Sequence, residues 1–584
     1  MFRSDKNVKG IVIGEKEYRL FQYADDTGIL LDGSERCLES ALHLLEQFAK
    51  YSGLKPNLDK TSCIWLGTKK LCSEILCPEK NLNWSKKPFV VLGIKFSTNL
   101  QEMIDLNFES KFNDIQKLIK TWSKRLLSVP GRITVVKTLL LSRLTHLIIC
   151  LPRIENENVK RLEKAFFNFI WYDNRKKKVK TDRIARAQLI QDYSLGGMRM
   201  VHVKSFIQSM KLVWLQRFLL TDAPWTVLCK HIVKDGLESI FKFGDCYTKK
   251  IMKHMTNPFW KEVLDSFLHF RNLQKFAGNK VETIYDSLWY NDNILIGGEP
   301  VFYKRWYGKG IHNIGDLLTE YGALMTYTEF CNTYFTPMLT TFMGLRNSIL
   351  EAYTWLHDGV HSTPILPHCP KYLFCILNNG RNNTKIYDIL VESIPHEQRY
   401  VAKWNREFNI QMETCEWNEI NRNIKTPMDV KLRWFQYRIV HRIISTNTFL
   451  YTIGIAESPL CTFCEELPET IIHLFLECGV VNTCVRETLT WLGSEEREMA
   501  TVLDIDIVLG KPSRKYKTLN TILILLKYYI YKCRARQHLP TLDGCKQEVK
   551  DYFFLEEFIQ KKNMKSEVFQ KQWHDFIDIL STVE

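Results

Sequence analysis

Phe21-Gln22-Tyr23-Ala24-Asp25-Asp26-Thr27 sets two adjacent carboxylates within a stretch, 18–31, whose other residues are typical of β-strands. The pair suits a metal site, because Mg²⁺ prefers carboxylate oxygens and two-metal phosphoryl transfer needs them over the attacking and leaving oxygens. Asp-Asp is also acceptable as the turn of a β-hairpin. The heptapeptide alone leaves both interpretations open.

The segments that flank the aspartates follow in a definite order. A predicted hairpin at 9–21 precedes them, and a second strand at 27–31 comes after them. A helix at 35–51 follows, with Ser34 as N-cap and Gly53 at its end. Its apolar stripe should pack under the strands and consists of Leu38, Ala41, Leu42, Leu45, Phe48 and Ala49. Further strands are predicted at 62–66 and 89–96.

This order resembles the rear half of the palm of a LINE-type reverse transcriptase, from retrotransposons that lack long terminal repeats. In that family Tyr-x-Asp-Asp is motif C, residues 53–61 match motif D, and Val91-Leu92-Gly93-Ile94 matches motif E, the primer grip. The resemblance implies that Asp25 and Asp26 hold Mg²⁺ and that Lys60 donates a proton to the departing pyrophosphate. The nucleic-acid contacts that it implies here are Tyr23, Leu92 and Gly93.

The same resemblance places another metal-binding aspartate, a substrate-contacting motif B and the fingers well upstream of motif C. Only 24 residues precede Asp25. The acids among them, Asp5, Glu15 and Glu17, do not match the missing motif, and the family's endonuclease domain is absent as well. We therefore expect the 584-residue chain to be inactive as a polymerase by itself.

Composition favours a folded intracellular protein. The 584 residues are 45% hydrophobic and 12% aromatic, which is enough for several cores. The 17 cysteines form no dense framework and no secretory leader is recognisable, so we expect a reducing compartment, the cytoplasm and nucleus. The longest apolar runs, 138–151 and 521–530, are interrupted by charged residues and too short to span a bilayer, so we expect no membrane role. No pattern indicates the oligomeric state.

Basic residues are concentrated in one part of the chain. Between residues 111 and 213 there are 22 Lys or Arg against 7 Asp or Glu, an excess that equals the net charge of +15 of the whole chain. Aromatic residues are interleaved with them: Trp122, Phe166, Phe167, Phe169, Trp171 and Tyr172. Cations that displace phosphate counterions and rings that stack on bases favour a nucleic-acid channel. Amphipathic helices with solvated basic faces are the alternative.

The densest basic cluster follows a predicted helix at 158–171. We favour a loop that binds phosphate, and a nuclear-localisation signal or a solvated turn are the alternatives. Its cations are Arg175, Lys176, Lys177, Lys178 and Lys180. Arg132, in the Ser128-Val129-Pro130-Gly131-Arg132 segment that opens a long helix, is a further predicted nucleic-acid contact.

Cys461-x₂-Cys464-x₈-His473-x₄-Cys478 is the second motif with chemistry. Two thiols on a tight turn, followed by a histidine and a cysteine on a helix, are typical of a structural zinc site. The four ligand atoms should then lie within about four ångströms of each other. Buried cysteines with a core histidine are the alternative, and Cys484 is a weaker candidate ligand. The cluster resembles one near the C-terminus of LINE proteins.

The predicted fold class is α+β, mainly α. It comprises a partial reverse-transcriptase palm of antiparallel strands and a helix, a helical thumb, and helical C-terminal domains with a small zinc-binding motif. The expected parts are 1–100 (palm), 101–155 (thumb), 156–395 (basic, then neutral helices), 396–510 (zinc-binding) and 511–584 (C-terminal helices). Single helices are predicted at 431–449, 519–536 and 551–579.

We interpret the chain as part of an RNA-directed DNA polymerase of a LINE-type retrotransposon. The resemblance implies that it binds an RNA template, a DNA primer or target and deoxynucleotides for target-primed reverse transcription, with Mg²⁺ in the intact enzyme and structural Zn²⁺. The alternative is a non-catalytic nucleic-acid-binding, zinc-binding protein derived from such an element. A scaffold without nucleic acid would leave the local basic excess unexplained.

Overall fold

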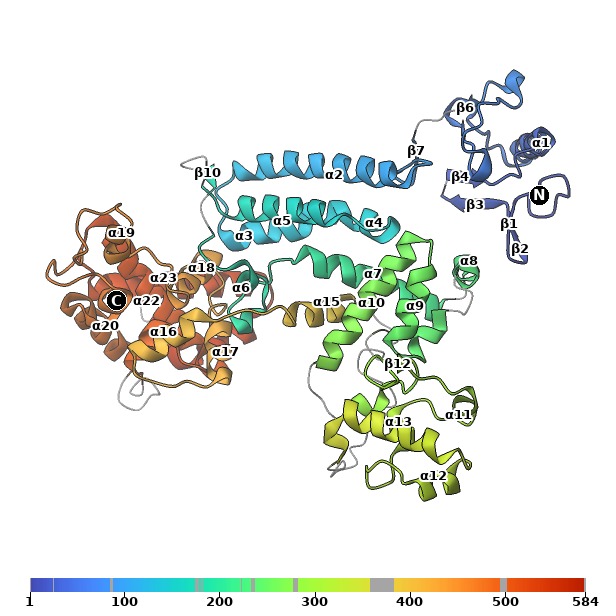
Figure 1. The fold of residues 1–584 in the computed structure, drawn as a ribbon. Helices are drawn as coiled ribbons and strands as arrows, with labels where there is room; N and C mark the ends of the chain where they lie inside the picture. Colours follow the sequence, from blue (N-terminus) through green and yellow to red (C-terminus); the bar gives the residue numbers. More distant parts are fainter. Residues whose placement is uncertain are drawn as a thin grey trace. The chain divides into compact units, whose positions relative to one another are not determined.

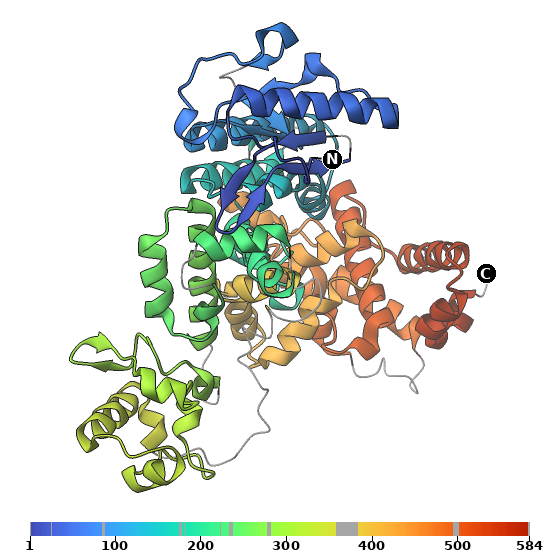
Figure 2. The same ribbon diagram turned by 90° about the vertical axis from the view of Figure 1, so that its right-hand side faces the viewer.

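The computed structural model describes residues 2–24, 26–84, 88–173, 178–179, 182–221, 223–232, 237–276, 282–357, 376, 383–493 and 502–581. The chain forms two compact units (Figures 1 and 2). Unit 1 comprises 1–116, 142–162 and 203–393, and unit 2 comprises 117–141, 163–202 and 394–584. Helices dominate both units, and each sheet among the described residues has two strands, which confirms the predicted mainly α fold.

Unit 1 begins with two antiparallel hairpins. β1 (Ile11–Ile13) pairs with β2 (Lys16–Tyr18), and β3 (Leu20–Tyr23) pairs with β4 (Asp26–Ile29). The strand predicted at 27–31 thus begins one residue earlier, with Asp26 opposite Tyr23. Ala24 has a φ of 51°, the left-handed conformation used in tight hairpin turns.

The next helix, α1 (Glu35–Ser52), has the predicted ends. Ser34 Oγ accepts the N–H of Cys37, and Gly53, with a φ of 74°, donates its N–H to the carbonyl of Ala49. The predicted apolar stripe is wrong in part, since Phe48 is 46% exposed. The buried face is rotated toward Val8, Leu76, Cys77 and Leu82, which provide its apolar partners in place of a sheet. It consists of Cys37, Leu38, Ala41, Leu42 and Leu44.

Short strands lead from α1 to a long helix. β5 (Ser62–Cys63) is shorter than predicted and runs parallel to β6 (Asn83–Trp84). β7 (Phe89–Val91) and β8 (Ile94–Phe96) form an antiparallel hairpin within the stretch predicted as strand at 89–96. The helix α2 (Leu100–Ser123) follows, and Asn107 fastens it to β8 by hydrogen bonds to both the N–H and the carbonyl of Lys95.

The rest of unit 1 is mainly helical, with one further antiparallel hairpin of β11 (Leu295–Ile296) and β12 (Glu299–Pro300). Its helices are α4 (Ser142–Cys150), the first part of α5 (Asn156–Ile170), α7 (Val203–Leu220), α8 (Pro224–Ile232), α9 (Asp245–His254), α10 (Pro258–Phe276), α11 (Lys304–Gly308), α12 (Tyr327–Thr333), α13 (Leu339–Ala352) and α15 (Asn383–Glu392). Two apolar clusters hold them together, one centred on α7 and α10 and the other around Trp289 and Trp306. Aromatic residues of 302–307 therefore belong to a core.

Unit 2 is also mainly helical. Its elements are α3 (Val129–Val135), η4 (Val136–Leu140), β9 (Tyr172–Asp173), β10 (Lys178–Val179), α6 (Arg186–Ile190), α16 (Arg399–Glu407), α17 (Thr414–Asn423), α18 (Val430–Val440), α19 (Asn447–Thr452), η10 (His473–Glu477), α20 (Gly479–Leu492), α21 (Asp504–Leu509), α22 (Lys517–Arg536), α23 (Leu542–Lys562), α24 (Ser566–Trp573) and α25 (Ile577–Ser581). The core helix α22 is buried over much of its length and contacts α18 and α23.

Two predicted helices of unit 2 are broken in the structure. The one predicted at 431–449 ends at Val440, because Arg442 adopts a positive φ of 57° and Thr446 caps the separate helix α19. The one predicted at 551–579 starts earlier, at Leu542, where Thr541 accepts the N–H of Gly544, and Met564 breaks it with a φ of 57°.

No single helix among the described residues is long and apolar enough to cross a membrane. The consecutive segments Val129–Leu140 and Ser142–Cys150 meet that criterion only when taken together, by length and composition. Both segments carry fully buried apolar residues, including Leu140 and Leu144.

Candidate metal centre

Cys461 and Cys464 lie on a tight turn of unit 2 that backbone hydrogen bonds close. Leu460 and Pro468 form an antiparallel bridge, and Cys461 donates its N–H to the carbonyl of Leu467 at 2.8 Å. The N–H of Glu465 donates to the carbonyl of Cys461 at 3.0 Å, and Glu465 has a φ of 59°. The turn is therefore shaped by hydrogen bonds of its own backbone.

His473 and Cys478 come from the π-helical turn that follows. Cys478 donates its N–H to the carbonyl of His473 at 2.9 Å, which closes the wider turn of η10. Thr470 Oγ1 accepts the N–H of His473 at 3.0 Å. Cys478 immediately precedes α20, so one bend of the chain positions the last two side chains.

The four side chains converge. One ligand atom from each of Cys461, Cys464, His473 and Cys478 lies within 4.8 Å of the others, somewhat wider than the predicted four ångströms. The Sγ atoms of Cys461 and Cys478 are 3.9 Å apart, and Cys464 Sγ is 3.3 Å from His473 Nε2. Tetrahedral zinc with Zn–S bonds of about 2.3 Å separates two sulfurs by about 3.8 Å, so this donor set fits the ion.

The two thiols of the turn have pKa values shifted in opposite directions. Burial raises the pKa of Cys461 to about 12, although backbone N–H groups of residues 463 and 464 oppose the shift. For Cys464 the cost of burial is outweighed by the N–H donors of Glu466 and Leu467 and by His473, so its pKa is lowered to about 6. Cys464 is thus the thiol most readily available as a thiolate, the form that binds metal.

A buried carboxylate that sequence reasoning missed ties this turn to the core helix. Glu469 is fully buried and accepts the N–H of Asn447 at 2.7 Å and that of Thr462 at 3.2 Å. Arg534 of α22 donates its Nε–H to Glu469 at 2.7 Å and another N–H to Asn447 Oδ1 at 2.6 Å. The ion pair holds the cysteine turn against α19 and α22.

The predicted catalytic hairpin is exposed where it is described. Asp26 begins β4 with its side chain in solvent, and Tyr23 is 69% exposed; Asp25 lies outside the described residues. Lys60 ends the 3₁₀ turn η1 (Leu58–Lys60) and is exposed, with its N–H donated to Asn57 Oδ1. Leu92 and Gly93 form the tip of the β7–β8 hairpin, with φ values of 48° and 77°. No metal cluster that includes Asp26 or Lys60 is found among the described residues.

Arg132 does not lie where a nucleic-acid contact should be. Its side chain is 6% exposed and donates to the carbonyls of Phe169 at 3.0 Å, Ile170 at 3.2 Å and Tyr172. The first two carbonyls end α5, whose C-terminus attracts a cation, and Tyr172 begins β9. Arg132 therefore caps a helix, a role that the sequence analysis did not include. Four residues of the basic cluster lie outside the described residues: Arg175, Lys176, Lys177 and Lys180. The fifth, Lys178, is in β10, and its backbone pairs with that of Asp173 in β9.

His441 and Arg442, which directly follow α18, are packed inside unit 2. Arg442 forms an ion pair with Glu407 and stacks over the Trp404 ring at 4.2 Å. His441 stacks on Tyr437 at 4.0 Å between ring centroids. These contacts place both side chains in the packing of unit 2.

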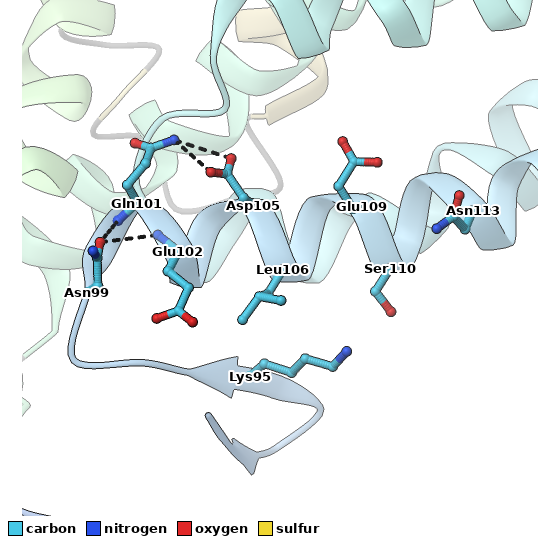
Figure 3. A pocket seen from close by; sticks show the side chains of 9 residues that line it. All are labelled: Lys95, Asn99, Gln101, Glu102, Asp105, Leu106, Glu109, Ser110 and Asn113. Atoms are coloured by element: carbon cyan, nitrogen blue, oxygen red, sulfur yellow. Dashed lines mark hydrogen bonds between the residues drawn. The ribbon is translucent and has the colours of Figure 1, made fainter. Parts of the chain in front are cut away.

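An open pocket of unit 1 runs along α2 beside the β7–β8 hairpin (Figure 3). Glu102, Asp105 and Glu109 of α2 line it; Glu102 points toward the side where Lys95 of β8 lies, and Asp105 and Glu109 point to the opposite side. Gln101 donates to Asp105 at 3.2 Å, and Glu109 pairs with Arg161. A carboxylate-lined pocket repels phosphate, so we place no nucleic-acid contact in it.

Comparison with known proteins points to reverse transcriptases. Residues 387–484, which contain the four converging side chains, match a family described as zinc-binding in reverse transcriptase. The chain is also 25% identical over 236 residues to a Transposon TX1 uncharacterized 149 kDa protein of Xenopus laevis. That alignment covers 39% of this chain and 17% of the relative.

The chain thus carries a zinc-binding region of the reverse-transcriptase type, with a Cys₃His donor set that supports structural zinc. Both similarities support the resemblance to the C-terminal region of a reverse transcriptase from a retrotransposon without long terminal repeats. The chain spans about a sixth of the length of the transposon protein that it matches.

Proposed function

We propose that this chain binds RNA template and DNA primer as part of a LINE-type reverse transcriptase, and that zinc stabilises the fold of its C-terminal region. The observation that carries the proposal is the convergence of Cys461, Cys464, His473 and Cys478 inside the segment that matches reverse transcriptases. In the intact protein Asp25 and Asp26 would hold Mg²⁺, the ion that phosphoryl transfer requires.

Exposed cations near the end of α2 support nucleic-acid binding. Lys117, Lys120 and Lys124 follow one another at helical spacing in unit 2, and all three are exposed. Arg125 lies over the Trp122 ring at 4.5 Å, which pairs a cation with an aromatic face. Such a stripe suits a phosphate backbone, whose counterions it would displace.

The test is binding of a single-stranded RNA to the zinc-loaded chain over a series of salt concentrations. We expect affinity to fall steeply as salt rises, since each phosphate contact releases a counterion. Replacing Lys176, Lys177 and Lys178 by Gln should flatten that dependence. Affinity that is the same at low and high salt would contradict the proposal.

A matched control removes the same charge elsewhere. Lys562, Lys565 and Lys571 are exposed at the end of α23 and on α24, far along the sequence from the basic region. Their replacement by Gln changes the net charge by the same amount and should leave most of the salt dependence of RNA affinity unchanged. Equal losses in the two triple variants would mean that net charge alone, and no defined channel, attracts RNA.

We further propose that the chain alone does not polymerise DNA. Glu17, which precedes the hairpin, is bonded to Arg19 at 2.6 Å and to the N–H of Gly10 at 2.6 Å. These bonds, the one to Arg19 foremost, lower the pKa of Glu17. Asp5 accepts the N–H groups of Asn7 and Val8 in a local turn. Both carboxylates are thus engaged in local bonds, which supports the proposal.

A further inference from the structure

The zinc-bearing part of unit 2 lacks the cations that phosphate binding requires. From Ile443 to Val485 there is no Lys or Arg, whereas Glu457, Glu465, Glu466, Glu469 and Glu477 all fall in this stretch. Glu469 is buried against Arg534, and the other four are exposed. Three thiolates around one Zn²⁺ add a further negative charge when the site is loaded.

Charged groups at the borders of this stretch are already engaged. Arg442, which precedes it, pairs with Glu407, and Arg486, which follows it, pairs with Asp504 at 2.5 Å. Within the described residues, no ion pair involves any of the four exposed glutamates. The field of this segment is therefore negative and would repel a nucleic-acid backbone.

The same segment exposes large apolar side chains. Those around α19 and the cysteine turn, with their exposed fractions, are Phe449 (44%), Tyr451 (51%), Ile453 (49%), Ile455 (63%), Leu460 (38%) and Leu467 (55%). Hydrogen bonds join α19 to the turn: Asn447 donates to the carbonyl of Leu460 at 2.8 Å, and Thr448 donates to that of Glu469. We call these six side chains, with Glu457, Glu465 and Glu466, the zinc-turn face.

We propose that the zinc-turn face binds a basic, amphipathic segment of a partner protein and does not bind nucleic acid. Apolar side chains of such a segment would cover Ile453, Ile455 and Leu467, and its lysines or arginines would face the glutamates. Exposed apolar residues with a charged rim are the arrangement of protein interfaces. Charge complementarity selects a basic partner over an acidic one. Zinc then serves the face by fixing the turn that presents it.

The test uses the zinc-loaded full chain and a fluorescent 18-residue helical peptide with leucines on one face and lysines on its flanks. A matched peptide carries glutamate at each lysine position. We expect the lysine peptide to bind more weakly as salt rises, and the glutamate peptide to bind at least about tenfold more weakly than the lysine peptide. Equal binding of the two peptides would overturn the proposal.

Two double variants locate the binding site. Ile453→Ser with Ile455→Ser removes apolar area, and Glu465→Lys with Glu466→Lys reverses the charge. Each should raise the dissociation constant of the lysine peptide at least about tenfold. The controls Leu539→Ser, at a side chain 60% exposed elsewhere in unit 2, and Glu320→Lys in unit 1 should leave it unchanged. Zinc content and circular dichroism check that every variant folds.

The alternatives for this face give distinct results. RNA affinity that falls tenfold in the Ile453/Ile455 variant, with peptide binding unchanged, would assign the face to nucleic acid and overturn the proposal. A dimer that dissociates in this variant and binds no peptide would assign the face to a second copy of the chain, with the same consequence. Loss of peptide binding with RNA affinity retained supports the proposal, whether or not the RNA experiment above succeeds.

Discussion

The Glu469 carboxylate is the residue on which the cysteine turn depends most. It accepts hydrogen bonds from the backbone of Asn447 and Thr462 and from Arg534, and none of its surface is exposed. A buried ion pair gains little over an apolar pair of the same shape, but removing one member leaves the other charge uncompensated. The pair therefore makes the position of the turn specific.

Glu469→Ala should destabilise unit 2 strongly. Arg534, whose side chain is 10% exposed, would lose its counter-ion in a buried setting, which costs about 3–5 kcal/mol of the free energy of unfolding. Urea unfolding followed by circular dichroism measures the change. Glu557→Ala is the control, because Glu557 pairs with Lys561 on the surface and such pairs contribute about 0.5 kcal/mol. Equal effects of the two substitutions would rule out this role for Glu469.

Cys464→Ser should abolish tight zinc binding. A hydroxyl is a poor replacement for a thiolate at zinc, and Cys464 is the turn's more acidic thiol. We expect the metal content of the purified chain to fall from about one zinc per chain to near zero, as atomic emission would measure. Cys415→Ser changes an exposed cysteine outside the cluster and should keep the metal. Zinc retained in the first variant would mean that other residues hold it.

The sequence was sufficient to predict the metal ligands but not the residues that hold the cysteine turn in place. Cys461, Cys464, His473 and Cys478 could be predicted because metal ligands of a small turn are close in sequence and of recognisable type. Arg534 lies 65 residues beyond Glu469, and nothing in local spacing links an arginine of α22 to a glutamate of the turn. The partners of Arg132 could not be predicted either. Its charge suggested a nucleic-acid contact, but the carbonyl groups to which it donates lie about 40 residues away in the sequence.

Among the secondary-structure elements, helix ends that are capped by residues nearby in the sequence could be predicted. Ser34 and Gly53 fix α1 through bonds within four residues. The helix predicted at 431–449 failed because its apolar pattern continues across the break, where Arg442 turns the backbone and Thr446 starts α19. The buried face of α1 was predicted wrongly in part for another reason. Its partners, such as Leu76 and Leu82, come from a loop without periodicity.

Arg132→Met should weaken the contact between α3 and the C-terminus of α5. The substitution keeps the length of the side chain but leaves the carbonyls of Phe169, Ile170 and Tyr172 without their charged donor. We expect a loss of about 2 kcal/mol in the free energy of unfolding, with RNA affinity unchanged, measured by urea unfolding and fluorescence anisotropy. Lys124→Met, at an exposed lysine, is the control and should keep stability while weakening RNA binding. The opposite pattern would indicate that Arg132 contacts nucleic acid.

Over the whole molecule, charge is divided along the chain. Residues 111–213 carry the basic excess, whereas the stretch from Ile443 to Val485 has no cation. The two regions are therefore suited to different partners, and the zinc site, despite its reverse-transcriptase match, lies in the one less suited to RNA. Composition summed over the chain would have hidden this division, because the net charge of +15 averages the two.

The purified chain, at the scale of the whole molecule, should not extend a primer on an RNA template with Mg²⁺ and deoxynucleotides. Two metal ions must be held in fixed positions for in-line phosphoryl transfer, and Asp26 stands exposed at the start of β4 while Glu17 is bonded to Arg19. The measurement is product length on a denaturing gel, with an intact reverse transcriptase as positive control. Template-dependent synthesis that Asp26→Ala abolishes would contradict this expectation and would show that another carboxylate completes the site.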